Sequence, residues 1–130
     1  PKDFFDYVMF SWGNCQAGDR LVMERQLGRS PTAEEMGVGF IPGVRFYFRY
    51  DELDRHPQAV HDGFLPIKVK NEVELNKYVF AVIVPELHRK KIAEYVPAQL
   101  LQRTHYLDSS NLDVWEWSEK VYSYVCGITC

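Results

Sequence analysis

The segment YVFAVIV, residues 78–84, constrains the fold more than any other part of the chain. It is the most hydrophobic stretch of the sequence, and Pro85 follows it directly. Seven apolar residues suffice for a buried strand and are far too few for a helix that crosses a bilayer. We therefore expect a globular protein built around this strand, with no membrane partner.

Composition supports a folded domain and excludes one class of partner. The 130 residues are enough for one domain with a sizeable core, and 46% of them are hydrophobic. The net charge of -3 comes from acids and bases mixed along the chain, so no basic face is expected for a nucleic acid. Three cysteines make no disulfide framework and no secretory signal is recognised, which together favour a cytoplasmic location.

Further strands are predicted on both sides of this segment. DYVMFSW, residues 6–12, is apolar on both faces, which is typical of a central strand. VRFYFRY, residues 44–50, alternates, so we expect one face, with Val44, Phe46, Phe48 and Tyr50, in the core and the other, with Arg45, Tyr47 and Arg49, to extend its arginines into solvent. FLPIKV, residues 64–69, contains Pro66 and is predicted as an edge strand, and RTHYL, residues 103–107, as a short strand.

Capping residues predict the helices. Asp19 is expected as the N-cap of a helix that stops at Gly28, and Ser30 as the N-cap of a short helix that begins at Pro31. The predicted helices and helical turns are residues 19–27, 32–36, 85–95 and 97–101, with one turn inside the loop 51–62 and a mild tendency at 71–77.

The segment 113–125 has two interpretations. Asp113 and Glu116 form a capping box and the apolar residues follow a helical stripe, whereas the alternation of Trp and Val also suits a strand pair. We favour the helix. The fold predicted is α+β, a single domain of residues 1–130 with a mixed five-stranded sheet or small barrel and three to five flanking helices. The tail 126–130, which holds Cys126 and Cys130, is expected to be frayed.

Two tryptophans in this segment are a candidate interface. On a helix Trp117 would point inward and Trp115 elsewhere, and an exposed tryptophan is a favoured anchor at protein interfaces. This predicts a partner or a homodimer through Trp115 and Trp117. The alternative is that both rings cap the core.

A glycine corner between the first strand and its helix is the main candidate site. Gly13 lets a ligand approach main-chain amides, and the helix N-terminus favours negative charge. A cradle for a small-molecule carboxylate is therefore predicted at Trp12, Gly13, Asn14, Cys15 and Gln16. The alternative is a tight turn with a packed indole and a buried thiol.

Other reactive residue types give weaker signals. Cys15 could act as a nucleophile at a helix N-terminus, but an inert buried thiol is favoured. His56, His61 and Asp62 match no strong ligand spacing, so no metal is expected, and no motif calls for a cofactor.

Four short motifs resemble the gamma-glutamyl cyclotransferase-like family. They are WGNC after the first strand, PGVRFYF followed by HPQAVHDG, YVFAVIV with the helix after it, and RTHYL, which occur in the family's order over residues 7–107. The resemblance implies a small mixed barrel with flanking helices and a pocket over the glycine corner.

The resemblance also implies an activity. In such enzymes a glutamate takes a proton from the α-amine of the substrate, which then attacks its own γ-glutamyl carbonyl and releases 5-oxoproline. The family's glutamate aligns with Val96, and the nearest acid is Glu94, which becomes the provisional base. We therefore expect a small enzyme of this type, acting on a γ-glutamyl amine or similar small carboxylate. The alternative is a non-catalytic ligand-binding or protein-interaction module.

Overall fold

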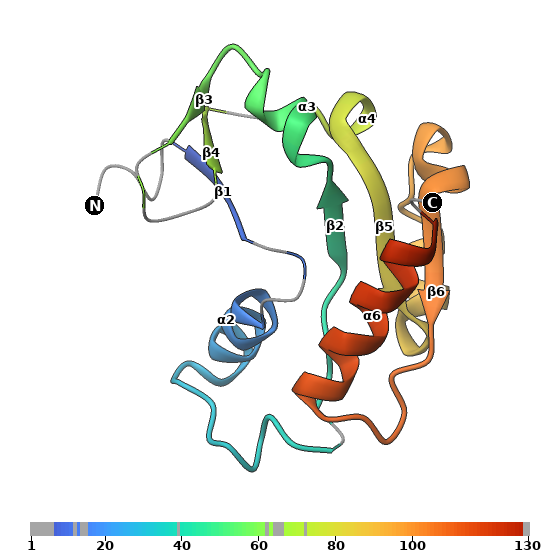
Figure 1. The fold of residues 1–130 in the computed structure, drawn as a ribbon. Coiled ribbons are helices and arrows are strands. Elements are labelled where there is room, and N and C mark those ends of the chain that lie inside the picture. Colours follow the sequence, from blue (N-terminus) through green and yellow to red (C-terminus); the bar gives the residue numbers. More distant parts are fainter. Residues whose placement is uncertain are drawn as a thin grey trace.

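The computed structural model describes residues 7–11, 13, 16–38, 40–61, 63, 67–71 and 73–128. Over these residues the protein is α+β, as expected (Figure 1). The described strands form two sheets of three and do not close into a barrel, which differs from the single five-stranded sheet or small barrel predicted.

The first sheet contains β1 (Tyr7–Phe10), β4 (Ile67–Lys70) and β3 (Ala59–Val60). Its order is β1-β4-β3 and both pairings are antiparallel. The sequence predicts β1 as a central strand and β4 as an edge strand, and both predictions are wrong. Among the described strands, β1 lies at an edge of this sheet and β4 is its central strand. The reason for the second error is local, because the described part of the strand begins at Ile67, after the proline that suggested an edge.

The second sheet contains β2 (Arg45–Phe48), β5 (Val79–Pro85) and β6 (Thr104–Leu107), in the order β2-β5-β6. The predicted buried strand is confirmed as the central β5, which pairs antiparallel with β2 and parallel with β6. The register shifts between Tyr47 and Phe48, whose partners are Ala81 and Val79. The extra residue of this bulge is Phe80. All residues of β5 are apolar, so both of its faces are apolar.

Helix α6 (Val114–Ile128) covers one face of the second sheet. Its buried stripe of Val114, Trp117, Val121 and Val125 packs in one core cluster with Ala81 and Ile83 of β5. The helical interpretation of this segment is confirmed, and so is its capping box: the amide of Glu116 donates to Asp113 at 2.8 Å, and the amide of Asp113 donates to Glu116 at 3.1 Å. Because the helix continues to Ile128, the prediction of a frayed tail is wrong for residues 126–128.

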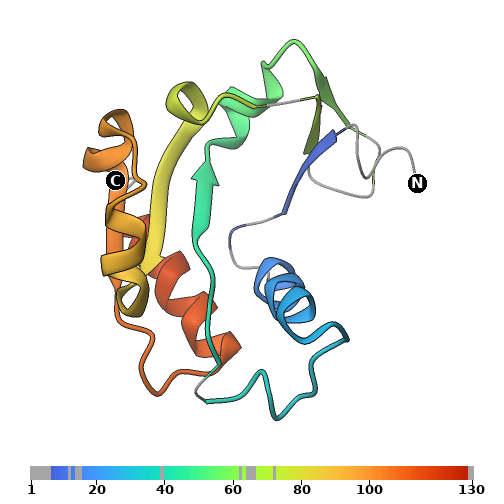
Figure 2. The same ribbon diagram turned by 180° about the vertical axis from the view of Figure 1, so that it is seen from behind.

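Short helical segments cover the opposite face (Figure 2). They are α5 (Arg89–Ala93), which follows η1 (Glu86–His88), and η2 (Ala98–Arg103). Helix α4 (Leu75–Tyr78) directly precedes β5 and has no buried residue. The helix predicted over 85–95 is thus a 3₁₀ turn followed by a short α-helix. Ile92 and Val96 pack against the β5 residues of this face, whereas Leu87 and Tyr95 are exposed.

Helix α2 (Ala17–Leu27) lies beside β2, on the side away from β5 (Figure 1). It ends at Gly28, whose φ of 72° is left-handed, so the predicted stop is confirmed. The predicted cap is wrong: Gln16 is the N-cap, and Asp19 lies within the first turn of the helix.

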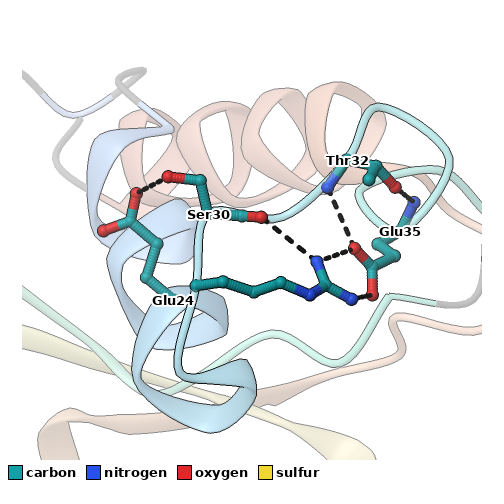
Figure 3. Close-up of polar contacts among 5 residues, drawn as sticks. Glu24, Ser30, Thr32 and Glu35 are labelled. Carbon is teal, nitrogen blue, oxygen red and sulfur yellow. Dashed lines mark hydrogen bonds and ion pairs between the residues drawn. The ribbon is translucent and has the colours of Figure 1, made fainter.

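The segment after α2 forms a turn instead of the predicted helix. Thr32 and Glu35 exchange the hydrogen bonds of a capping box, at 3.0 and 3.2 Å, around a single turn (Figure 3). Arg29 donates two hydrogen bonds to the Glu35 carboxylate, at 2.7 and 2.9 Å, while Ser30 contacts Glu24. The cap is therefore Thr32 and not Ser30.

Helix α3 (Tyr50–Asp54) joins the two sheets. Its buried Leu53 packs with Ile67 and Val69 of β4, and Phe10 and Phe48 close the same cluster from β1 and β2. In the part of the chain that the structure describes, no helix is both long and apolar enough to cross a membrane.

Candidate functional site

A cavity of about 370 Å³ lies between the two sheets. The end of β1, helix α2, all four residues of β2, and helix α3 contribute to its walls. This volume lies within the range of small-molecule sites in proteins. The residues that matter for its chemistry are Gly13, Asp19, Arg45, Tyr47, Phe48 and Leu53.

The polar side chains of the cavity form one network. The guanidinium of Arg45 pairs with the carboxylate of Asp19 and donates to the hydroxyl of Tyr47 at 3.0 Å. The Tyr47 hydroxyl donates in turn to the carbonyl of Gly13 at 3.0 Å, and Arg45 reaches the same carbonyl at 3.4 Å. Helix α2, strand β2 and the glycine corner are therefore joined through these side chains.

This ion pair is largely removed from water. The side chain of Asp19 is 3% exposed and that of Arg45 is 13% exposed. Burial raises the pKa of the Asp19 carboxyl above its ordinary value, and the charge of Arg45 and its hydrogen bond offset part of that shift. A carboxyl group that resists ionisation beside a fixed cation is able to exchange a proton with a ligand.

The structure places two of the five predicted cradle residues. Gly13 lines the cavity, where its carbonyl accepts the two hydrogen bonds just described, so this residue presents an acceptor to the network. Gln16 is half-buried at the start of α2 and lines a separate hollow with Arg20 and Trp115. Trp12, Asn14 and Cys15 lie outside the described residues.

Glu94 lies at the C-terminal end of α5, where it is exposed. That helix packs on the face of the second sheet opposite α6, and Glu94 is not among the described residues that line the cavity. The structure therefore does not bring the provisional base and Gly13 to one site.

The residues missed from the sequence are Asp19, Arg45 and Tyr47. The sequence predicts Asp19 as a helix cap and places Arg45 and Arg49 in solvent. The second prediction is wrong for Arg45. A signal was present: Arg45 and Tyr47 alternate with Phe46, so both point to one face of an edge strand, and a buried arginine requires an acid partner.

The other candidates are separated from this site. Trp117 is fully buried and Trp115 is 64% exposed, as the helical interpretation predicts, and self-association through Trp115 stays a prediction. His61 contacts Asp54 at 2.7 Å, and the ring of His56 accepts the amide of Gln58 at 3.0 Å. Within the described ranges, no three His, Cys, Asp or Glu side chains are grouped as metal ligands.

No protein-family model, curated protein or solved structure matches the chain. The cavity and its polar network are therefore the features that indicate a function.

Proposed function

We propose that the protein binds a small molecule bearing a carboxylate in the cavity between its two sheets. The observation that carries this proposal is the position of Arg45: its guanidinium lines the cavity and is oriented by Asp19, Tyr47 and the Gly13 carbonyl. The contacts of Arg45 with these three residues use three of its five N–H groups. A planar, preoriented guanidinium is the side chain best suited to a carboxylate.

The charge of Asp19 makes this binding depend on pH. An incoming carboxylate meets the negative charge of Asp19 as well as the positive charge of Arg45. Burial already raises the pKa of Asp19, and a second anion beside it raises that pKa further. Carboxylate binding is therefore coupled to proton uptake by Asp19, and the affinity falls as the pH rises.

Calorimetric titration with 4-phenylbutyrate tests the proposal. We expect saturable binding that weakens as the pH rises, measured above about pH 5.5, where the free ligand stays ionised. Titrations in two buffers of different ionisation enthalpy should reveal proton uptake on binding.

Arg45→Lys keeps a cation beside Asp19 but loses the planar fork, and should weaken binding at least about tenfold. Arg25→Lys is the matched control on exposed α2 surface. Equal affinity for both variants would exclude Arg45 as the carboxylate ligand.

Catalysis in the same cavity is a second candidate, favoured by the buried carboxyl group of Asp19. In a reaction resembling that of gamma-glutamyl cyclotransferases, this group would take the proton from the substrate α-amine as the amine attacks the γ-carbonyl. The γ-amide bond would then break, and the same group would return the proton to the departing amine as 5-oxoproline is released. A raised pKa suits a general base that works near neutral pH. Asp19 is the acid that lines the cavity among the described residues, so we assign the base to it in place of Glu94.

The release of 5-oxoproline from a γ-glutamyl amine, measured for variants of each residue, shows whether Asp19 or Glu94 is the base. Asp19→Asn keeps a polar partner for Arg45 and should lower turnover at least about 100-fold, the usual scale for loss of a general base. Loss of turnover in Glu94→Gln alone would return the base to Glu94. If the wild-type protein binds the γ-glutamyl amine but releases no 5-oxoproline, the protein is a binding module and not an enzyme of this type.

A further inference from the structure

We propose that the ligand is amphipathic, with its carboxylate at Arg45 and an aromatic or aliphatic tail that follows β2 toward α3. This inference rests on the proposed carboxylate site and names the class of molecule that fills the remainder of the cavity. It follows from how polar and apolar residues are distributed along the walls.

The charged side chains of the cavity, Asp19 and Arg45, lie together at one end. Asp19, Arg45 and Tyr47 are linked to one another and to the carbonyl of Gly13 by the network described above. All of them belong to the first half of α2, the first three residues of β2 or the glycine corner. A ligand's charged group is stabilised only at this end.

The opposite end of the cavity is apolar. Phe10, Phe48, Leu53 and Ile67 line it, and these four residues belong to the core cluster of the first sheet. The rings of Phe10 and Phe48 meet edge to face, with centroids 5.1 Å apart, and form a wall. Within this group there is no side chain that can donate or accept a hydrogen bond, so a polar ligand group placed here would be desolvated without compensation.

Strand β2 sets the distance between the two ends. It contributes Arg45 to the polar end and, three residues further on and on the opposite face of the strand, Phe48 to the apolar end; both residues line the cavity. At roughly 3.3 Å per residue, an extended strand covers about 10 Å over these three steps. A short carboxylate occupies only the polar end, whereas an extended medium-length chain or an aryl-alkyl chain reaches both.

Aromatic surface at the cavity walls adds a driving force. Phe46 is 45% exposed and Tyr50 is 42% exposed, and both line the cavity. Water therefore contacts large apolar rings beside the site. A tail that covers these rings removes apolar surface from water, which favours binding in proportion to the area covered.

A matched series of straight-chain carboxylates tests the inference: acetate, butyrate, hexanoate and octanoate, each titrated into the full chain by calorimetry. We expect the affinity to rise about threefold to fourfold for each methylene group added. The heat-capacity change of binding should become more negative along the series. Octylamine, which has the tail without the carboxylate, should bind at least about tenfold more weakly than octanoate.

Variants locate the tail. Phe46→Ala removes an exposed ring from the cavity wall and should weaken octanoate binding several-fold, with little effect on acetate. Leu87→Ala is the matched control, because Leu87 is also exposed and is not a lining residue. Affinity that is independent of chain length, yet still lowered by Arg45→Lys, would overturn the tail and leave the carboxylate site standing. Absence of binding by every member of the series would overturn both.

Discussion

Gly13 is the residue whose small size the site depends on most. A Cβ atom built there would lie 3.1 Å from two carbon atoms of the Tyr122 ring and 3.1 Å from one of Tyr47. The Tyr47 ring is held in place, because its hydroxyl donates to the carbonyl of Gly13 itself. The corner therefore requires glycine for close packing between two rings, and not for an unusual backbone angle.

Gly13→Ala should destabilise the protein by about 1–2 kcal/mol, since the added methyl group must displace a tyrosine ring. Urea denaturation followed by far-UV circular dichroism measures this change. Gly18→Ala is the matched control: a Cβ atom there meets nothing within 4 Å, and alanine is the better helix former inside α2, so the variant should gain about 0.5 kcal/mol. Equal stability of Gly13→Ala and wild type would show that the rings move aside freely.

Asp19 shows where reasoning from single residues fails. An aspartate before an apolar helical stripe is a good cap by local chemistry, and the sequence suggested that role. The helix instead begins two residues earlier, and the side chain pairs with Arg45, 26 residues away. Tertiary pairing of this kind leaves no local trace, so the position of Asp19 in the cavity could not be predicted from the sequence around it.

Elements whose determinants are local could be predicted best. The strand β5 depends on a continuous apolar run, the end of α2 on Gly28, and the start of α6 on the pair Asp113 and Glu116. By contrast, whether a strand is central or an edge depends on its partners, and both positions predicted from local sequence, for β1 and for β4, are wrong. The capping box at Thr32 and Glu35 was missed because Ser30 offered a similar signal two residues earlier.

The Asp113 cap provides a prediction at the scale of an element. Its carboxylate accepts the amide of Glu116 at 2.8 Å, one of the amides that have no partner inside α6. Asp113→Ala should lower the free energy of unfolding by about 1 kcal/mol, the usual value for loss of an N-cap. Asp113→Asn retains an acceptor and should stay close to wild type. If both variants lose the same amount, the charge of the cap matters more than its hydrogen bond.

At the scale of the whole molecule, opposing pKa shifts determine the response to acid. Hydrogen bonds from Arg29 and from the backbone of Thr32 lower the pKa of Glu35 to about 2 from an ordinary 4.5, and Arg89 likewise lowers the pKa of Glu86. These carboxylates stabilise the folded state above their unfolded pKa, and this stabilisation is lost as the pH falls toward the folded pKa. The raised pKa of Asp19 acts in the opposite direction: relative stability falls as the pH rises through it.

Urea denaturation between pH 6 and 2 should therefore show stability falling from about pH 4.5 downward. Glu35→Gln removes the titrating group and should make this fall shallower. Arg29→Met returns the pKa of Glu35 toward its ordinary value and should flatten the same part of the curve. A Glu35→Gln curve parallel to that of wild type would show that the contact between Arg29 and Glu35 forms too rarely in solution to matter.

The chain passes back and forth between its two sheets, and this connectivity bears on synthesis and truncation. Strands β1, β3 and β4 lie in one sheet and β2, β5 and β6 in the other, so neither sheet comes from a continuous stretch of sequence. Met23 from near the start and Val125 from near the end share one core cluster. On the ribosome that core cannot be completed until α6 has emerged. No internal cleavage point would divide this protein into two halves that each keep an intact sheet.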